Sequence, residues 1–211
     1  MAAMEQVLDI YQQPYDPLHP VVCMDEASKQ LTADVQAPLP MRPGQIERED
    51  CNYQRLGVGN LFLAFEPAVG RRDVTVTERR GKAEWAAYAK HIVDDLYPHA
   101  ETITLVCDQL NTHAVSSLYA TFPAAEAHRL ARKFCIVYTP KHGSWLNMAE
   151  IEFSALSHQC TDRRFESRLQ LEHEVAAWTQ ARNAAATSVH WQFTTADARI
   201  KLASLYPQFG P

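Results

Sequence analysis

Apolar runs that end on an acidic residue occur twice along the chain. Residues 103–107, Ile-Thr-Leu-Val-Cys, are followed by Asp108, and residues 21–24, Val-Val-Cys-Met, are followed by Asp25. A short apolar run of this kind predicts a strand that is buried on both faces, as in the interior of a sheet. Because open α/β sheets place ligand sites at the carboxyl ends of their strands, we expect both acids at such an edge.

The rest of the chain alternates between strand and helix periodicity. Further strands are predicted over 60–66, 73–77, 102–107 and 135–138, with a hairpin-like connection over 67–72 and a loop over 36–54. Helices are predicted over 81–97, 114–134 with a break near Pro123, 145–160, 168–186 and 196–205, the last capped by Thr195. This order predicts an α/β domain, a mixed sheet flanked by helices.

The first twenty residues differ from the remainder of the chain. A short amphipathic stretch over 4–11 is followed by prolines at 14, 17 and 20, which favour an extended connection. With 211 residues and 46% hydrophobic content, the chain suits one globular domain of ordinary size. We therefore expect a linker remnant over 1–20 and a single domain over 21–207.

Charge and cysteine usage narrow the class of protein. The net charge is −5, whereas proteins that bind nucleic acid over a broad face are usually basic, so any DNA contact must use local patches. The five cysteines are odd in number and form no C-x-x-C pair, which argues against a disulfide scaffold or a zinc ribbon. No membrane span or signal peptide is evident, and a cytoplasmic protein is expected.

Two converging carboxylates predict a metal site. If their strands are neighbours, Asp25 and Asp108 would repel each other unless a cation lies between them, and Mg²⁺ or Mn²⁺ prefers such oxygen ligands. A third acid is available on the helix predicted over 145–160, whose apolar stripe is Leu146, Ala149, Phe153, Leu156 and Cys160. Glu150 and Glu152 each fall about 80° from the middle of this stripe, on opposite sides, so periodicity leaves both open.

Three segments resemble a known family. Residues 22–26 (Val-Cys-Met-Asp-Glu), 108–113 (Asp-Gln-Leu-Asn-Thr-His) and 139–150 (Thr-Pro-Lys-His-Gly-Ser-Trp-Leu-Asn-Met-Ala-Glu) are similar to motifs of bacterial insertion-sequence transposases of the mariner superfamily. The likeness is closest to the 630 insertion-sequence family and extends from about Tyr11 to Pro207. The third motif is long and unusual, which makes the resemblance specific.

The resemblance implies a ribonuclease-H-like catalytic domain with an Asp-Asp-Glu triad. Asp25, Asp108 and Glu150 would be its three acids, since the family's third acid lies three residues after the motif asparagine, here Asn147; Glu152 is the runner-up. Two Mg²⁺ or Mn²⁺ ions would activate a water, and then a DNA 3′-hydroxyl, for in-line attack on a phosphodiester. The partners implied are transposon-end and target DNA, typically at a TA dinucleotide, and a second copy of the chain in the active complex.

Several polar residues near these motifs are candidate DNA contacts: Lys141, His142, Arg79, Arg80, Lys82, Asn111 and His113. The helix start after Lys141 and His142 suits a phosphate, and the cluster at 79–82 suits the DNA backbone. Asn111 suits a turn or a helix cap equally well, and basic clusters often lie in solvated loops that bind nothing. For these residues a purely structural role therefore stays open beside DNA contact.

Members of this family usually carry N-terminal helix-turn-helix segments that recognise terminal repeats, and these are absent here. We therefore expect a truncated gene product, a separately encoded catalytic half or an engineered domain, with weak, salt-sensitive and largely non-specific DNA binding. Two alternatives remain: a metal-dependent nuclease of the same fold without strand transfer, and an inactive remnant that regulates full-length transposase by dimerising with it.

Overall fold

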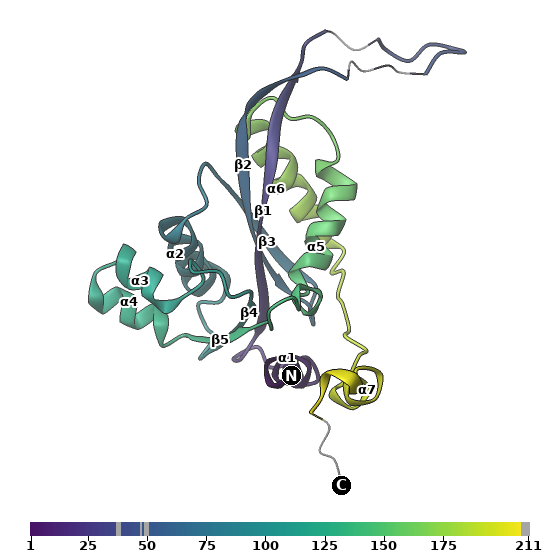
Figure 1. Ribbon diagram of the computed structural model, residues 1–211. Helices are drawn as coiled ribbons and strands as arrows, with labels where there is room; N and C mark the ends of the chain where they lie inside the picture. Colours follow the sequence, from purple (N-terminus) through teal and green to yellow (C-terminus); the bar gives the residue numbers. More distant parts are fainter. Residues whose placement is uncertain (37–38, 47, 49–50, 208–211) are drawn as a thin grey trace.

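The computed structural model describes residues 1–36, 39–46, 48 and 51–207. Its central element is a five-stranded sheet, in the order β3-β2-β1-β4-β5, with helices on both faces (Figure 1). The strands are β1 (Val21–Asp34), β2 (Tyr53–Glu66), β3 (Arg71–Thr77), β4 (Ile103–Cys107) and β5 (Phe134–Tyr138). The α-helices are α1 (Ala2–Tyr11), α2 (Lys82–His91), α3 (Val115–Thr121), α4 (Ala124–Ala131), α5 (Ala149–Leu156), α6 (Arg168–Ala184) and α7 (Thr195–Lys201). The predicted mixed sheet flanked by helices is confirmed.

The sheet is mixed because β1 has one antiparallel and one parallel neighbour. β2 is antiparallel to both β1 and β3, whereas β4 is parallel to both β1 and β5. In the parallel pair, Val21 lies opposite Thr104 and Cys23 lies opposite Val106. Because β1 and β4 run in the same direction, the residues that follow Cys23 and Val106 leave the paired region side by side.

Alternate side chains of the sheet enter two separate cores. On one face, Met24 and Phe62 pack against α2, α3 and α4, with Trp85 of α2 fully buried among them. On the other face, Cys23 and Val106 pack against residues of α1, α5 and α7. A third cluster joins α5 and α6 to β1 and β2. Since successive residues of a strand point to opposite faces, one strand serves both cores.

The helix α1 departs from the prediction of a linker over residues 1–20. Its buried side chains are Met4, Val7, Leu8 and Ile10. They recur at helical spacing and pack on the sheet face that carries Cys23 and Val106. The linker prediction is therefore wrong for Ala2–Tyr11, which belong to the folded body, and residues 12–20, with the three prolines, connect α1 to β1.

β1 and β2 are longer than the predicted strands at 21–26 and 60–66. Each has 14 residues, and their outer halves form a two-stranded ribbon that projects from the body (Figure 1). The pairing continues to Asp34 and Tyr53, with a register shift between Leu31 and Thr32. The outer halves pack on little of the core, so their sequence lacks the alternation that would have revealed them.

Three smaller predictions are also affected. The helix predicted over 145–160 is interrupted: a 3₁₀ turn at Ser144–Leu146 precedes α5, and a π-helical turn at Ser157–Thr161 follows it. Thr194, rather than Thr195, caps α7 through a reciprocal bond pattern with Asp197. Part of the loop predicted over 36–54 lies at 37–38, 47 and 49–50, outside the described residues. Among the helices described, none has both the length and the apolar character to cross a membrane.

Candidate active site

The sheet register brings the two predicted aspartates together. Cys23 lies opposite Val106, and two further positions along each parallel strand lead to Asp25 and Asp108. Because side-chain direction repeats every two residues, Asp25 shares the face of Cys23 and Asp108 follows the face of Val106. That face is the one against which α5 packs, so both acids lie on the side of the sheet from which Glu150 comes.

The electrostatics of Asp25 show that it has acidic neighbours. The pKa of the Asp25 carboxyl is raised to about 6. Burial is the largest cause, the charges of Asp108 and Glu150 add to it, and a 2.8 Å hydrogen bond from the Glu26 backbone N–H opposes it. A carboxylate repelled by two others is the situation that a divalent cation relieves. The structure thus places the three predicted acids within electrostatic reach of one another.

Asn147 fixes the start of α5 to the strand that carries Asp25. Its side-chain amide donates to the backbone oxygen of Met24 at 2.9 Å, and its side-chain oxygen accepts from the backbone N–H of Ala149 at 3.2 Å. Asn147 is almost fully buried, so both bonds are shielded from water. The first turn of α5, which contains Glu150, is therefore held beside the residue that precedes Asp25.

The environment of Glu152 differs from that of Glu150. Its side chain is fully buried and lies 3.3 Å from Nε of Arg72 and 2.8 Å from an Nη atom of Arg182. Arg72 is anchored in turn by the side chain of Asn183 and the backbone oxygen of Thr187. Glu152 therefore joins α5 to β3 and α6 through buried ion pairs, whereas Glu150 is partly exposed.

Asp108 is held by a histidine rather than standing free. Nδ1 of His113 lies 2.6 Å from Oδ1 of Asp108, and the backbone N–H of Leu110 donates to the same oxygen at 3.2 Å. Burial opposes ionisation of Asp108, but the contact with His113 outweighs it and lowers the pKa of the carboxyl. For His113, burial is likewise overcome by bonds to Asp108, Cys107 and Glu26, which raise its pKa to about 12.

His113 is therefore not a DNA contact, which corrects the prediction. Its side chain is completely buried, and its other ring nitrogen, Nε2, lies 3.0 Å from Oε1 of Glu26. The ring is stacked on Trp85, with centroids 6.0 Å apart. With both nitrogens facing carboxylates and one face against an indole, the ring cannot reach a phosphate.

The other candidate DNA contacts lie at the surface around the acids. Arg79, Lys141 and His142 are exposed, and Lys82 and Asn111 line a pocket of about 520 Å³ beside the loop that follows Asp108. Arg80 is 44% exposed and lies 3.4 Å from Oε2 of Glu26. These six residues remain predictions, because the structure contains no DNA.

Asp25, Asp108 and Glu150 offer the oxygen ligands and the negative charge that a divalent metal ion requires. Among the described residues, no three histidine, cysteine or acidic side chains are gathered tightly enough to hold an ion by themselves. Mg²⁺ is usually bound by one or two carboxylates, with waters and substrate phosphates completing its shell, so a full protein cage is not required. The pKa of Asp25 is raised by burial and then by the charges of Asp108 and Glu150, and a cation would relieve the repulsion between these carboxylates.

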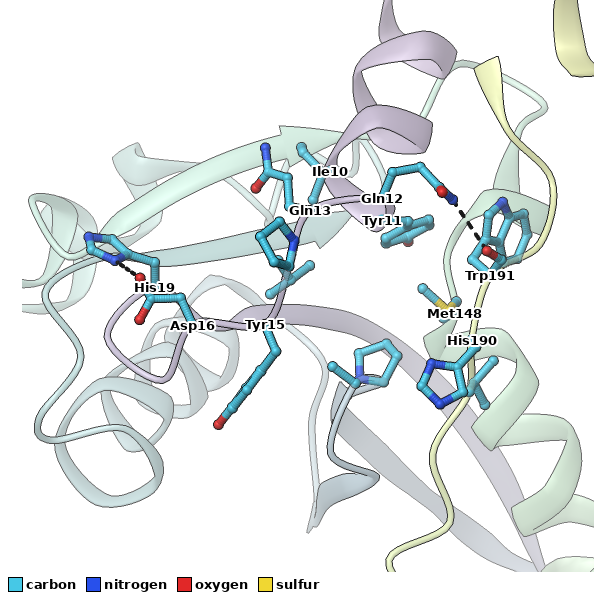
Figure 2. A pocket seen from close by; sticks show the side chains of 15 residues that line it. Ile10, Tyr11, Gln12, Gln13, Tyr15, Asp16, His19, Met148, His190 and Trp191 are labelled. Atoms are coloured by element: carbon cyan, nitrogen blue, oxygen red, sulfur yellow. Dashed lines mark hydrogen bonds and ion pairs between the residues drawn. The ribbon is translucent and has the colours of Figure 1, made fainter. Parts of the chain in front are cut away.

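A second hollow, at the start of β1, is lined by none of these acids. Figure 2 shows this pocket of about 580 Å³, in which Tyr11, Tyr15 and Trp191 surround the start of β1. Asp25, Asp108 and Glu150 do not line it. Pocket size therefore does not mark the two aspartates, which lie within β1 and directly after β4, the interior strands of the sheet.

Comparison with known proteins agrees with this geometry. Residues 20–172 match the DDE superfamily endonucleases. The chain belongs to this family. The matched region includes all three acids, and the family membership makes this DDE endonuclease an enzyme of the nuclease and transposase class. No curated protein matches the sequence.

Solved structures with a similar fold are complexes of the Mos1 mariner transposase. The DDE endonuclease is 14% identical to the paired-end complex with Mn, with a TM-score of 0.57 over 88% of this chain and 55% of that one. The Mos1 strand transfer complex gives 14% identity and a TM-score of 0.59 over 88% and 54%. The chain thus spans little more than half the length of these proteins, and the likeness confirms the ribonuclease-H-like fold.

The sequence motifs contain Glu26, His113 and Asn147, but they did not predict that these residues support the acids. Glu26, His113 and Asn147 act through buried contacts between segments far apart in the chain, which periodicity does not reveal. One signal was available: Glu26 directly follows Asp25 on a strand, so the two must point to opposite faces. An acid directed into the sheet's apolar side requires a buried partner.

Proposed function

We propose that the chain is the catalytic domain of a DDE transposase, which cuts DNA phosphodiesters at transposon ends and transfers the ends into target DNA. The observation that carries this is the parallel register that sets Asp25 beside Asp108, with Glu150 raising the pKa of Asp25 from the first turn of α5. The strand transfer and paired-end assemblies of Mos1, which share the fold, support the choice of transposition.

In this proposal Asp25, Asp108 and Glu150 hold one or two Mg²⁺ or Mn²⁺ ions through their carboxylate oxygens. Such ions supply a nucleophile at neutral pH and stabilise charge on the leaving oxygen of an in-line displacement. The chain's own part is to fix the three carboxylates: Asn147 holds the start of α5 against β1, and His113 and the Leu110 N–H hold Asp108. No side chain needs to act as a covalent nucleophile.

DNA would approach the carboxyl edge of β4 across a local basic surface, since the net charge of −5 excludes a broad one. Its residues would be Arg79, Arg80, Lys82, Asn111, Lys141 and His142, which are exposed around the acids. With so few cations, we expect binding by this chain to be weak, salt-sensitive and largely independent of sequence.

The active complex is proposed to contain two copies of the chain. The outer halves of β1 and β2 project from the body, and they and the described residues between them expose large apolar side chains (Figure 1). These are Val35, Leu39, Met41, Ile46, Tyr53, Leu56 and Val58. Exposed apolar groups gathered on one projection mark a surface for protein contact, and a second copy that brings the other transposon end is the partner proposed.

Five narrower features complete the proposal and rest on the sequence analysis. The chain would be of bacterial origin and belong to the 630 insertion-sequence family, and it would insert at TA dinucleotides. It would act in the cytoplasm on the nucleoid. Residues 21–207 would form the catalytic domain, to which α1 adds core residues.

Nicking of supercoiled DNA tests the proposal. Wild type should nick the DNA only when Mg²⁺ or Mn²⁺ is present, and Asp108→Asn should not. Asp95→Asn is the matched control, because Asp95 is an exposed acid after α2 and lies outside the site. Equal nicking by wild type and Asp108→Asn would show that the assigned site is wrong.

Strand transfer separates a transposase from a plain nuclease of the same fold. DNA ends that are already cut should be joined to a target plasmid by wild type and not by Asp108→Asn. Nicking without joining would favour the metal-dependent nuclease. Metal-dependent cleavage of any kind would exclude an inactive regulatory remnant.

A further inference from the structure

A buried chain of polar contacts lies beneath the acids and links Glu26 of β1 to Asp108, the residue that follows β4. Nδ1 of His113 lies 2.6 Å from Oδ1 of Asp108, and Nε2 of the same ring lies 3.0 Å from Oε1 of Glu26. Arg80 continues the chain to the surface, 3.4 Å from Oε2 of Glu26. The imidazole and the Glu26 carboxylate are both almost completely buried, so these contacts are made out of water.

Strand geometry explains why this chain starts next to Asp25. Asp25 and Glu26 are consecutive residues of β1 and point to opposite faces of the sheet. Asp25 lies on the face that meets α5, while Glu26 lies on the face of Met24, where α2 packs. His113, from the loop after β4, passes to that second face and meets Glu26 there. One imidazole thus couples the strand of the first acid to the carboxylate of the second.

The imidazole ring has little freedom to move. It stacks on Trp85 with an interplanar angle of 28°. The backbone of His113 is held at both ends, because its N–H donates to the Leu110 oxygen at 2.9 Å and its own oxygen accepts from the Tyr138 hydroxyl at 2.6 Å. Because the ring cannot move, it restricts the orientation of the two carboxylates that it contacts, those of Asp108 and Glu26.

We propose that His113 is a positioning residue that orients the Asp108 carboxylate for metal binding by bracing it against Glu26. The contacts from His113 and from the Leu110 N–H both fall on Oδ1 of Asp108, which leaves Oδ2 to accept a metal ion. Carboxylate ligands of metals are commonly oriented by such outer partners, whose loss costs about 10- to 100-fold in metal affinity. This inference rests on the proposed metal-binding role of Asp108.

Three substitutions of His113 separate its two contacts. The amide nitrogen of asparagine lies near the position of Nδ1 and can still donate to Asp108, whereas that of glutamine lies near Nε2 and can still donate to Glu26. Alanine removes both contacts. Ser117→Ala is the matched control, because Ser117 is buried in the same segment and donates to the Thr112 oxygen at 2.7 Å, without contact to either carboxylate.

The experiment measures Mn²⁺ binding to each folded variant by electron paramagnetic resonance, with a melting curve to confirm folding. We expect His113→Gln and His113→Ala to bind Mn²⁺ about 10- to 100-fold more weakly than wild type, and His113→Asn to lie between them and wild type. Glu26→Gln should also weaken binding, because it removes the brace, whereas Ser117→Ala should leave the affinity unchanged.

Two results would overturn the inference while leaving the proposed function in place. One is wild-type Mn²⁺ affinity in His113→Gln and His113→Ala when Asp108→Asn has lost it. The other is a loss in Ser117→Ala as large as that in His113→Ala, which would show general loosening. Equal Mn²⁺ binding by wild type and Asp108→Asn would instead remove the metal assignment, and the inference with it.

Discussion

At the scale of single residues, folding disfavours the ionised form of the Asp25 side chain. Burial and the charges of Asp108 and Glu150 raise its pKa to about 6. The folded protein therefore holds this proton more tightly than the unfolded chain, where the pKa is about 3.9. This tighter proton binding by Asp25 contributes to the stability of the folded protein in full below about pH 4, and the contribution is lost as the pH rises through about 6. At neutral pH the ionised Asp25 carboxylate therefore lowers the stability of the metal-free protein.

Replacing Asp25 with asparagine should therefore stabilise the metal-free protein. We expect the free energy of unfolding at pH 7 to rise by about 1–3 kcal/mol, since two pH units of pKa shift correspond to roughly 3 kcal/mol in full. Denaturant unfolding of wild type and Asp25→Asn at pH 4 and pH 7 measures this. The gain should vanish at pH 4; a gain of equal size at both pH values, or none at pH 7, would contradict the electrostatic account.

At the scale of elements, α5 carries two glutamates whose surroundings differ. Glu150 lies in the first turn, within electrostatic reach of Asp25, and Glu152 is buried between Arg72 and Arg182. Breaking a buried ion pair leaves the remaining charge without compensation, which is strongly destabilising. The two residues should therefore respond differently to the same substitution.

Glu150→Gln should abolish nicking with little change in stability, and Glu152→Gln should lower the free energy of unfolding by about 3 kcal/mol. Each variant is the matched control for the other, because both replace one glutamate on the same helix by glutamine. Thermal or denaturant unfolding, together with the plasmid nicking assay, gives both readouts. Loss of nicking in a stable Glu152→Gln protein would reverse the assignment of the third acid.

The same helix shows what sequence reasoning could predict. The apolar stripe of α5 placed Glu150 and Glu152 symmetrically, and only the family motif favoured Glu150. The deciding contacts come from Arg72 on β3 and Arg182 on α6, about 80 residues before and 30 after it. The two aspartates were predictable because local apolar runs stop at Asp25 and Asp108, but only Asp108 follows a strand end, since β1 continues past Asp25 to Asp34. Buried polar pairing between distant segments leaves no local pattern.

The helix α1 and the outer halves of β1 and β2 also show where prediction from the sequence fails. The helix α1 was predicted as part of a linker because the prolines that follow it dominated the segment, although its apolar residues recur at helical spacing. The outer halves of β1 and β2 were missed because they pack on little of the core, so that no buried face imposed an alternating pattern. Propensity and periodicity predict elements that have a buried face, and they give little signal for an element that projects from the core.

At the scale of the whole molecule, the projecting ribbon is proposed to contact a second copy. Met41 and Ile46 are 72% and 79% exposed. Replacing both with serine should leave the melting temperature unchanged and weaken dimer formation on transposon-end DNA by at least about tenfold, or about 1.4 kcal/mol. Gln45→Ser, in the same turn, is the control, because it changes an exposed polar residue.

Sedimentation velocity of protein–DNA mixtures over a range of protein concentrations measures this dimerisation. A wild-type chain that remains monomeric on DNA at every concentration would contradict the two-copy proposal. So would a double variant that dimerises as tightly as wild type. A fall in melting temperature would instead show that the two side chains stabilise the monomer.

The central claim is that Asp25, Asp108 and Glu150 bind the metal ions with which this DDE endonuclease cuts DNA. Anomalous diffraction from crystals of the protein with Mn²⁺ and a nicked DNA end tests it most directly. The account predicts a manganese peak about 2.1 Å from carboxylate oxygens of Asp25 and Asp108, with Glu150 completing the site. Manganese bound elsewhere, or bound without either aspartate, would contradict it.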